Sequence, residues 1–242
     1  MIDFIVVSHS PSSVAELERT LHATMAGFPE TGGGGGAGGK SWRLVAVDGN
    51  THDLFTGYNA GAAEGNAEVL AFLHHDVRMH ANSVALERPL ELLKNPAVGF
   101  IGVCGATRLN AQGTWWGDLP QAQMMSFCRG AVGCPDGNPL GMNLLAWPGG
   151  AAVFGQVLVV DGVLLMCHRR TFDALQGFDA NTFKGFHFYD VDISLRAHLA
   201  GLKNLVAPIP LFHMSTGKYD AVWEAARQVF VRKFAGRLPC QL

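Results

Sequence analysis

The sequence predicts an α/β fold in which a mostly parallel sheet lies between two layers of helices. Short apolar runs alternate with helical patterns over the first hundred residues, which is typical of parallel strands joined by helical crossovers. These runs are almost continuously apolar, as expected for strands that are covered on both faces. The 242 residues and the 48% hydrophobic content are sufficient for a sizeable core, and we expect one domain over residues 1–242.

The first half of the chain contains a regular series of strands and helices. Residues 12–25 place Val14, Leu17, Leu21 and Met25 at helical spacing after a cap at Ser12 or Ser13. The neighbouring runs have the apolar, β-branched composition of strands or the spacing of further helices. The predicted strands are 2–7, 43–48, 68–76 and 98–105, and the predicted helices are 12–25, 53–64 and 83–93.

The second half of the chain begins with a change of composition. Residues 106–152 are rich in Gly, Pro, Trp and Met without any periodicity, and we expect an irregular insert there. Regular patterns then return. They predict a strand pair at 156–169, a short helix at 169–175, a helix at 189–201, a strand at 203–210 and a final amphipathic helix that includes Val222, Ala226, Phe230 and Phe234.

The stretch GGGAGGKS, from Gly34 to Ser41, matches the phosphate-binding pattern G-x-x-x-x-G-K-[ST] letter for letter. That loop needs a strand before it and a helix after it, so that backbone N–H groups point at the phosphates. Here Pro29 interrupts the preceding segment, and the following SWRLVAVDG has the composition of a strand. We therefore interpret residues 31–40 as a flexible glycine-rich loop.

Charge and composition exclude several classes of function. The formal net charge is −2 and no run of Lys or Arg occurs, so neither nucleic acid nor an anionic membrane is expected as a partner. No apolar stretch reaches the roughly 18 residues of a membrane helix, and the acidic N-terminus differs from a signal peptide; we expect a cytoplasmic protein. The five cysteines form no CxxC pair, so we expect reduced thiols without a thiolate zinc site. The sequence leaves open whether the chain forms a homo-oligomer.

Polar side chains follow several predicted strands, where ligands bind in parallel sheets. Asp76 ends the run HHD, and His213 follows the last strand; their oxygen and nitrogen atoms suit Mn²⁺ or Mg²⁺, with a diphosphate completing the shell. Asp190 offers a carboxylate that can act as a base. Simpler interpretations stay open: Asp76 as a turn cap, Asp190 as a helix cap and His213 as a packed side chain.

The order of these motifs resembles that of the GT-A glycosyltransferases, specifically the family 2-like group. Asn59 and Gly61 match the N-x-G element, after which EGN at 64–66 stands for A-x-G and FLHHD stands for FLDxD. Further on, GFD at 177–179 is followed by the pair Tyr189–Asp190 and by H-x-S-x-G from His213. The resemblance covers nearly the whole chain apart from the glycine tract and the insert.

This resemblance implies a Rossmann-like GT-A fold and an inverting transfer of a sugar from a nucleotide diphosphate, with a UDP-sugar favoured, to an acceptor hydroxyl. By analogy Asp190 is the catalytic base, and Asp76 and His213 hold Mn²⁺ or Mg²⁺. Asp48 would bind the nucleobase. The residues assigned to nucleotide-sugar binding are Ser8, His9, Asp48, Asn59, His74 and His75.

Two positions depart from the family pattern: His74 replaces the first acid of D-x-D, and Tyr189 replaces the acid before Asp190. We interpret them as the signature of a variant subgroup; an enzyme of reduced activity is the alternative.

The resemblance implies that the insert at 106–152 lies on the acceptor side, but the sequence defines the acceptor site less well. The candidates are Trp115 and Trp116, through stacking on a sugar ring, and Asp192. Burial of the tryptophans against the sheet, and a surface pair of Asp192 with Arg196, are the alternatives. Two other functions also remain open, a non-catalytic sugar-nucleotide-binding module and a nucleotidyltransferase or metal-dependent hydrolase.

Overall fold

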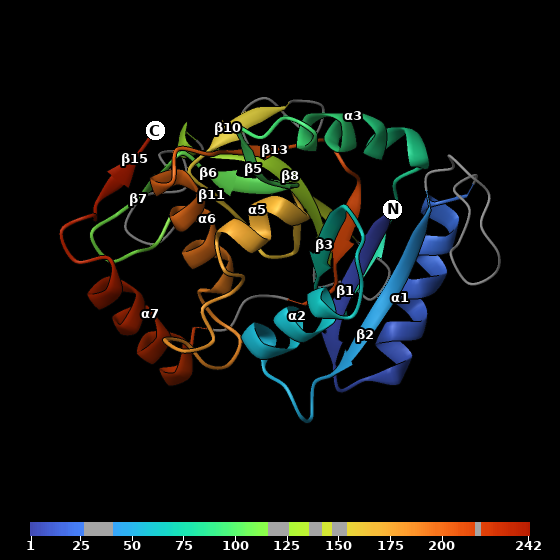
Figure 1. Ribbon diagram of the computed structural model, residues 1–242, viewed down its shortest axis with the longest axis horizontal. Helices are drawn as coiled ribbons and strands as arrows, with labels where there is room; N and C mark the ends of the chain where they lie inside the picture. The colour runs from blue at the N-terminus through green and yellow to red at the C-terminus, as the bar shows by residue number, and fades with distance from the viewer. Residues whose placement is uncertain (27–40, 116–125, 136–141, 147–153, 216–218) are drawn as a thin grey trace.

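The computed structural model describes residues 1–26, 41–115, 126–135, 142–146, 154–215 and 219–242. Within these residues the largest sheet has seven strands in the order β10-β13-β5-β12-β3-β1-β2 (Figure 1). In chain order they are β1 Ile2–Ser8, β2 Trp42–Asp48, β3 Val69–Leu73, β5 Val98–Gly102, β10 Gly155–Val157, β12 Leu164–His168 and β13 Lys203–Val206. β1 pairs in parallel with β2 and β3, and β5 with β13, whereas β12 and β10 run antiparallel to their neighbours. The predicted mostly parallel α/β sheet is confirmed, with two reversed strands.

Helices cover both faces of this sheet, as the apolar strands predicted. Along β1, Phe4 and Val6 belong to the same buried cluster as Leu17 and Leu21, whereas Ile5 and Val7 belong to a second cluster on the opposite face. This alternation follows from the two-residue period of a strand. The first face carries α1 Pro11–Thr24 and α3 Ser83–Leu93; the second carries α2 Leu54–Ala63, α5 Arg169–Ala174, α6 Tyr189–Leu199 and α7 Ala221–Lys233.

Two glycines let α2 lie directly on β1. A Cβ at Gly57 would lie 2.6 Å from a Val7 methyl carbon, and a Cβ at Gly61 would overlap the side chain of Ile5. Their spacing of four residues places both on the face of α2 that meets the sheet. Gly61 is the glycine of the N-x-G element, so this part of the motif serves close packing.

A second sheet joins the segment that the sequence predicted to be irregular. Its order is β11-β6-β8-β14-β4, with β9 paired to β8, and β7 pairs separately with β15. The strands are β4 Val77–Met79, β6 Cys104–Ala106, β7 Arg108–Leu109, β8 Cys128–Pro135, β9 Met142–Ala146, β11 Val159–Val160, β14 Leu211–His213 and β15 Cys240–Gln241. The described parts of residues 106–152 therefore contain strands, and the prediction of an irregular insert is wrong there.

Glycines explain why β8 gives no strand pattern. Gly130 has a positive φ of 86°, beside the carbonyl of Val103, and a Cβ at Gly133 would overlap the ring of Phe212. Glycine weakens a strand by propensity, yet only glycine permits backbone and ring to approach this closely.

The segment around the glycine tract agrees with the interpretation as a connection. α1 is capped by Ser10, whose Oγ accepts a hydrogen bond from the backbone N–H of Ser13, so the predicted cap at Ser12 or Ser13 lies too late. Immediately after Ser41 the chain enters strand β2, where a phosphate-binding loop requires a helix. The tract itself lies outside the described residues.

The remaining expectations about composition can also be compared with the structure. The five cysteines are free thiols, and Cys104, Cys128 and Cys167 are buried. Within the part of the chain that the structure describes, no helix has the length and apolar character to cross a membrane.

Candidate active site

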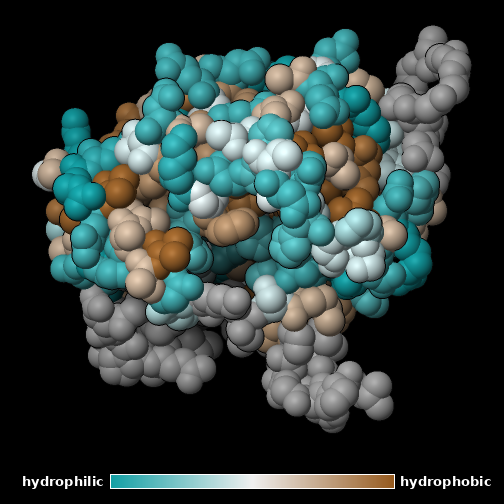
Figure 2. Space-filling view, turned by 90° about the horizontal axis from the view of Figure 1, so that it is seen from below, coloured by the Kyte–Doolittle hydropathy of each residue, from teal (hydrophilic) through white to brown (hydrophobic). Residues whose placement is uncertain are grey.

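The candidate residues gather at the carboxyl ends of the strands. Ser8 and Asp48 end β1 and β2 side by side in the parallel register, and His74 follows the last residue of β3. These ends point to the lower side of Figure 1, and Figure 2, which views the molecule from that side, shows a hollow in the surface. Parallel sheets bind ligands at this edge.

His74, Asp76 and His213 form a compact group of possible metal ligands, with one ligand atom of each within 4.8 Å of the others. The Nδ1 atom of His74 lies 3.0 Å from Nε2 of His213, and this Nε2 lies 3.4 Å from Oδ1 of Asp76. The pairing of β14 with β4, which matches His213 with Val77, brings the distant His213 to the end of β3. The sheet thus unites residues that are far apart in the chain.

The electrostatic environment of the group favours a charged Asp76 and a neutral His74. Burial alone would raise the pKa of Asp76, but hydrogen bonds with His213 and Ser215 outweigh it and hold the pKa below its usual value. For His213, the pairing with Asp76 outweighs burial and raises the pKa. Burial, with the neighbouring His213, lowers the pKa of His74 to about 3. The His74 imidazole is therefore neutral at physiological pH, as a ligand must be.

The spacing of these atoms fits a divalent cation. Octahedral Mg²⁺ has ligands at about 2.0–2.1 Å, so that adjacent ligand atoms lie about 3 Å apart. The separations of 3.0 Å and 3.4 Å are close to this value. Two imidazole nitrogens and one carboxylate oxygen form a ligand set that transition-metal ions accept. The residues present therefore fit a bound metal ion.

Asp190 lies in the first turn of α6, held by backbone amides. Its Oδ2 accepts from the N–H of Gly162 at 2.9 Å, and its Oδ1 accepts from the N–H of Val191 at 2.8 Å. The cap residue Phe188 has a positive φ of 68°, a rare conformation for a large side chain that costs free energy and is often found at functional sites. Its ring packs on Phe230, with centroids 5.2 Å apart, which helps to fix the start of the helix.

A neighbouring carboxylate that the sequence did not assign completes this part of the site. Burial raises the pKa of Asp190 to about 7, with a second contribution from the negative charge of Asp161. The pKa of Asp161 is itself raised by burial. Two buried carboxyl groups with raised pKa values are typical of acid–base sites. The signal was present in the sequence, because Asp161 directly follows strand β11 in VDG, much as Asp48 ends β2 in VDG.

A groove of about 410 Å³ lies at the ends of β1 and β2 and is lined by three of the residues assigned to the nucleotide. Ser8, His9 and Asp48 line it, together with Asn50 and Glu18 among others.

His75 stands next to this groove. Its Nδ1 lies 2.6 Å from Oγ of Ser8, and its ring centroid lies 5.5 Å from that of His9. The exposed Asp48 carboxylate accepts hydrogen bonds from the backbone and side chain of Asn50. The ends of β1 and β2 thus form one polar surface. His75 connects this surface to His74 and Asp76, its neighbours in the chain.

A protein-family model described as a glycosyltransferase-like family matches residues 39–234, which is most of the chain. The chain belongs to this glycosyltransferase-like family. The resemblance that the sequence motifs indicated is thereby confirmed. A search of curated proteins returned no match.

Solved structures of glycosyltransferases share the fold. One is GalNAc-T7 with UDP, GalNAc and Mn²⁺, with a TM-score of 0.55, 16% identity and alignment over 96% of this chain but 47% of that protein. Another is the mannosyltransferase PcManGT from Pyrobaculum calidifontis with GDP-Man and Mn²⁺, with a TM-score of 0.52, 10% identity and coverage of 97% and 70%. The chain thus spans about half the length of GalNAc-T7, and the likeness establishes the GT-A fold.

Asn59 differs from its expected role in this glycosyltransferase-like chain. Its Nδ2 donates to the carbonyl of Phe178 at 2.8 Å, and its Oδ1 accepts from the N–H of Phe178 at 2.9 Å. Both ends of the amide are therefore engaged with the backbone of the GFD turn. In the structure Asn59 thus holds this turn on α2, and its assignment to nucleotide-sugar binding stays a prediction.

The acceptor candidates also differ from expectation where the structure describes them. Asp192 is fully buried and bonds to Arg196 at 2.8 Å and to Lys233 at 2.5 Å, so its carboxylate has no free oxygen for an acceptor. Trp115 is only 8% exposed and belongs to the core, as the alternative interpretation predicted. Trp116 lies outside the described residues.

Proposed function

We propose that this protein transfers a sugar from a nucleoside diphosphate to an acceptor hydroxyl with inversion at the anomeric carbon. The observation that carries the proposal is the ligand group of His74, Asp76 and His213 at the carboxyl edge of a GT-A sheet. Asp161 and Asp190 lie near this group. Such a site has ligands for a metal-bound diphosphate and a carboxylate that can accept a proton.

Asp190 is suited to the role of general base. Its pKa of about 7 leaves a substantial fraction ionised at neutral pH while keeping the carboxylate basic enough to take a proton. The backbone N–H groups of Gly162 and Val191 hold both oxygens in place. In inverting transfer this carboxylate accepts the proton of the acceptor hydroxyl as the oxygen attacks the anomeric carbon, and the bond to the diphosphate breaks.

His74, Asp76 and His213 would hold the cation. When bound, Mn²⁺ or Mg²⁺ neutralises the negative charge that develops on the departing diphosphate. The groove lined by Ser8, His9 and Asp48 is placed to receive the nucleoside, with the Asp48 carboxylate available to accept hydrogen bonds from a base or ribose. A UDP-sugar is the first donor to test, and GDP-sugars follow because PcManGT was solved with GDP-Man.

The test is the release of UDP or GDP from a panel of sugar nucleotides with Mn²⁺ and with EDTA. We expect Mn²⁺-dependent release from at least one donor, by slow hydrolysis or by transfer. Asp190→Asn should lower the rate by about a hundredfold or more, in the range of a lost general base, while nucleotide binding, measured by calorimetry, stays within about twofold.

Asp192→Asn is not a suitable control, because Asp192 supports α6 and α7; Asp48→Asn tests the nucleotide groove separately and should weaken nucleotide binding. Metal-dependent binding of a sugar nucleotide without any release would favour the non-catalytic module. Turnover unchanged in Asp190→Asn would exclude Asp190 as the base.

A further inference from the structure

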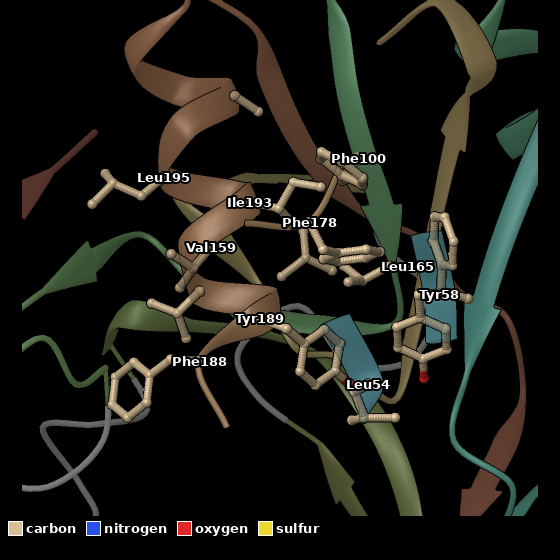
Figure 3. Close-up of a cluster of buried hydrophobic side chains, with 14 of the residues drawn as sticks. Leu54, Tyr58, Phe100, Val159, Leu165, Phe178, Phe188, Tyr189, Ile193 and Leu195 are labelled. Carbon is tan, nitrogen blue, oxygen red and sulfur yellow. The ribbon is translucent and has the colours of Figure 1, made fainter. Parts of the chain in front are cut away.

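The two positions at which the sequence departs from the family pattern contact each other. The Tyr189 hydroxyl lies 2.6 Å from Nε2 of His74 and donates to the carbonyl of Gly162 at 2.9 Å. Tyr189 is 3% exposed and His74 is partly buried. The Tyr189 ring packs against Tyr58, with centroids 5.5 Å apart, at the start of α6 (Figure 3). A substitution at one position therefore changes the surroundings of the other.

These hydrogen bonds fix the tautomer of His74. The Gly162 carbonyl can only accept, so the phenol proton points toward it, and the phenol oxygen accepts from Nε2–H of His74. With its proton on Nε2, the imidazole has its lone pair on Nδ1. That Nδ1 faces Nε2 of His213 at 3.0 Å, inside the ligand group formed with Asp76.

Gly162 is part of the same arrangement. A Cβ at this position would overlap the phenol oxygen of Tyr189, so only glycine allows the hydroxyl to lie between the Gly162 carbonyl and His74. The backbone N–H of the same glycine donates to Asp190. The VDG segment that ends with Gly162 thus orients both the tyrosine and the base.

We infer that Tyr189 is a positioning residue that fixes His74 as a third metal ligand, through Nδ1, beside Asp76 and His213. Metal-binding histidines commonly donate their other N–H to an oxygen that sets the tautomer and the ring orientation, and here a tyrosine oxygen takes that place. The inference rests on the proposed metal-dependent function. It assigns to His74 the cation rather than the nucleotide.

The ligand set has a consequence for metal choice. Mg²⁺ prefers oxygen ligands, whereas imidazole nitrogens suit transition metals. With His74 in addition to His213, two of the three protein ligands are nitrogens. Mn²⁺ is therefore expected to bind more tightly than Mg²⁺, and removal of one imidazole should reduce that preference.

The test is a double-mutant cycle on Mn²⁺ affinity in the full-length protein without donor, measured by the loss of the free Mn²⁺ electron paramagnetic resonance signal. Tyr189→Phe should weaken Mn²⁺ binding by about tenfold or more, the usual effect of removing a hydrogen-bond partner of a metal ligand. In the His74→Ala background the same substitution should change the affinity by less than about twofold, because no imidazole remains to be oriented.

Nitrogen couplings to bound Mn²⁺ supply a readout that a purely structural role would not change. Electron spin-echo spectra should show two coordinated imidazoles in the unmodified protein and one in His74→Ala. Tyr219→Phe is the control: Tyr219 is an exposed phenol that packs against Trp223, with ring centroids 5.4 Å apart, and its substitution should leave both imidazole couplings in place.

The outcomes separate the inference from the function on which it rests. No Mn²⁺ binding by the unmodified protein, with or without UDP, overturns the proposed metal site and the inference together. Mn²⁺ binding that is unaffected by Tyr189→Phe, or weakened equally in the His74→Ala background, overturns the inference alone. A single coordinated imidazole in the unmodified protein does the same.

Discussion

At the scale of single residues, the site places ionisable side chains such as Asp190 in a mostly apolar environment. Asp190 accepts two backbone hydrogen bonds, which favour its ionised form. Burial, and then Asp161, act in the opposite direction and prevail, so that the pKa reaches about 7. A carboxylate with this pKa is a good base, but its ionised form destabilises the folded protein, because the charge is removed from water.

The pKa of Asp190 predicts a pH-dependent gain in stability for Asp190→Asn. Its pKa is raised on folding from 3.8 to about 7, so the folded state binds the proton more tightly and stability falls as pH rises through that window. Removal of the charge should therefore raise the free energy of unfolding by about 1–3 kcal/mol more at pH 8 than at pH 5. Urea denaturation at both pH values, in EDTA, measures the difference.

Asp48→Asn is the control for this experiment, since Asp48 is exposed and hydrogen bonds to Asn50 lower its pKa. It should not stabilise the protein at pH 8. An Asp190→Asn variant with the same stability difference at pH 5 and pH 8 would contradict the raised pKa.

The sequence indicated some of the site residues, for physical reasons that can be named. Asp76 and His213 are polar residues at the ends of apolar strands, and the sheet brings them together. The pairing of Tyr189 with His74 was not predictable, because nothing in the spacing of residues 115 positions apart indicates a hydrogen bond. Asp161 had the same strand-Asp-Gly pattern as Asp48, but only the fold shows that it faces Asp190.

At the scale of elements, a buried ion-pair network joins α6, α7 and the GFD turn. Asp192 in α6 is fully buried between Arg196 and Lys233. Lys233, near the end of α7, also contacts Asp179 of the turn at 2.7 Å. Arg196 donates in addition to the carbonyl of Gly177 at 2.8 Å. The network connects the helix that carries Asp190 to the C-terminal helix.

This network predicts a large effect of Lys233→Met. The substitution leaves the buried Asp192 paired with Arg196 alone. Removal of one partner of a buried ion pair costs about 3 kcal/mol. Urea denaturation at pH 7 should show this loss in the free energy of unfolding. The matched control is Lys94→Met, since Lys94 pairs with Glu91 on an exposed surface and such pairs contribute about 0.5 kcal/mol or less. Equal effects of the two variants would contradict the role of the network.

Helices and buried strands were predicted well because their apolar periodicity is local. α3 has the predicted bounds, and α2 and α6 differ from expectation by one or two residues at their ends. The sequence did not predict β8 and β14, for two different reasons. β8 contains glycines that neighbours require but that hide its strand character, whereas the three residues of β14 depend on pairing with β4, which no local pattern encodes.

At the scale of the whole molecule, the chain enters β2 far from the site. Ser41, which follows the glycine tract, directly precedes β2, and the site begins at Asp48, so the seven residues of β2 separate Ser41 from the site by about 20 Å. The first N–H of β1 is bonded to the carbonyl of Ser41, which anchors the chain where it enters the sheet. We therefore expect changes in the tract to leave the strand ends that carry the ligands unchanged.

Deletion of residues 32–38 should leave both the fold and the site intact. The loop-closure entropy changes by only about 0.6 kcal/mol for each halving of the length, so we expect a change in the free energy of unfolding of less than about 1 kcal/mol and an Mn²⁺ affinity within twofold. Lys40→Ala, which removes the lysine of the G-x-x-x-x-G-K-[ST] match, should likewise leave UDP binding unchanged, as measured by calorimetry. A true phosphate-binding loop would lose its nucleotide in both variants. Loss of UDP binding in either variant would therefore indicate that the nucleotide binds at the glycine tract.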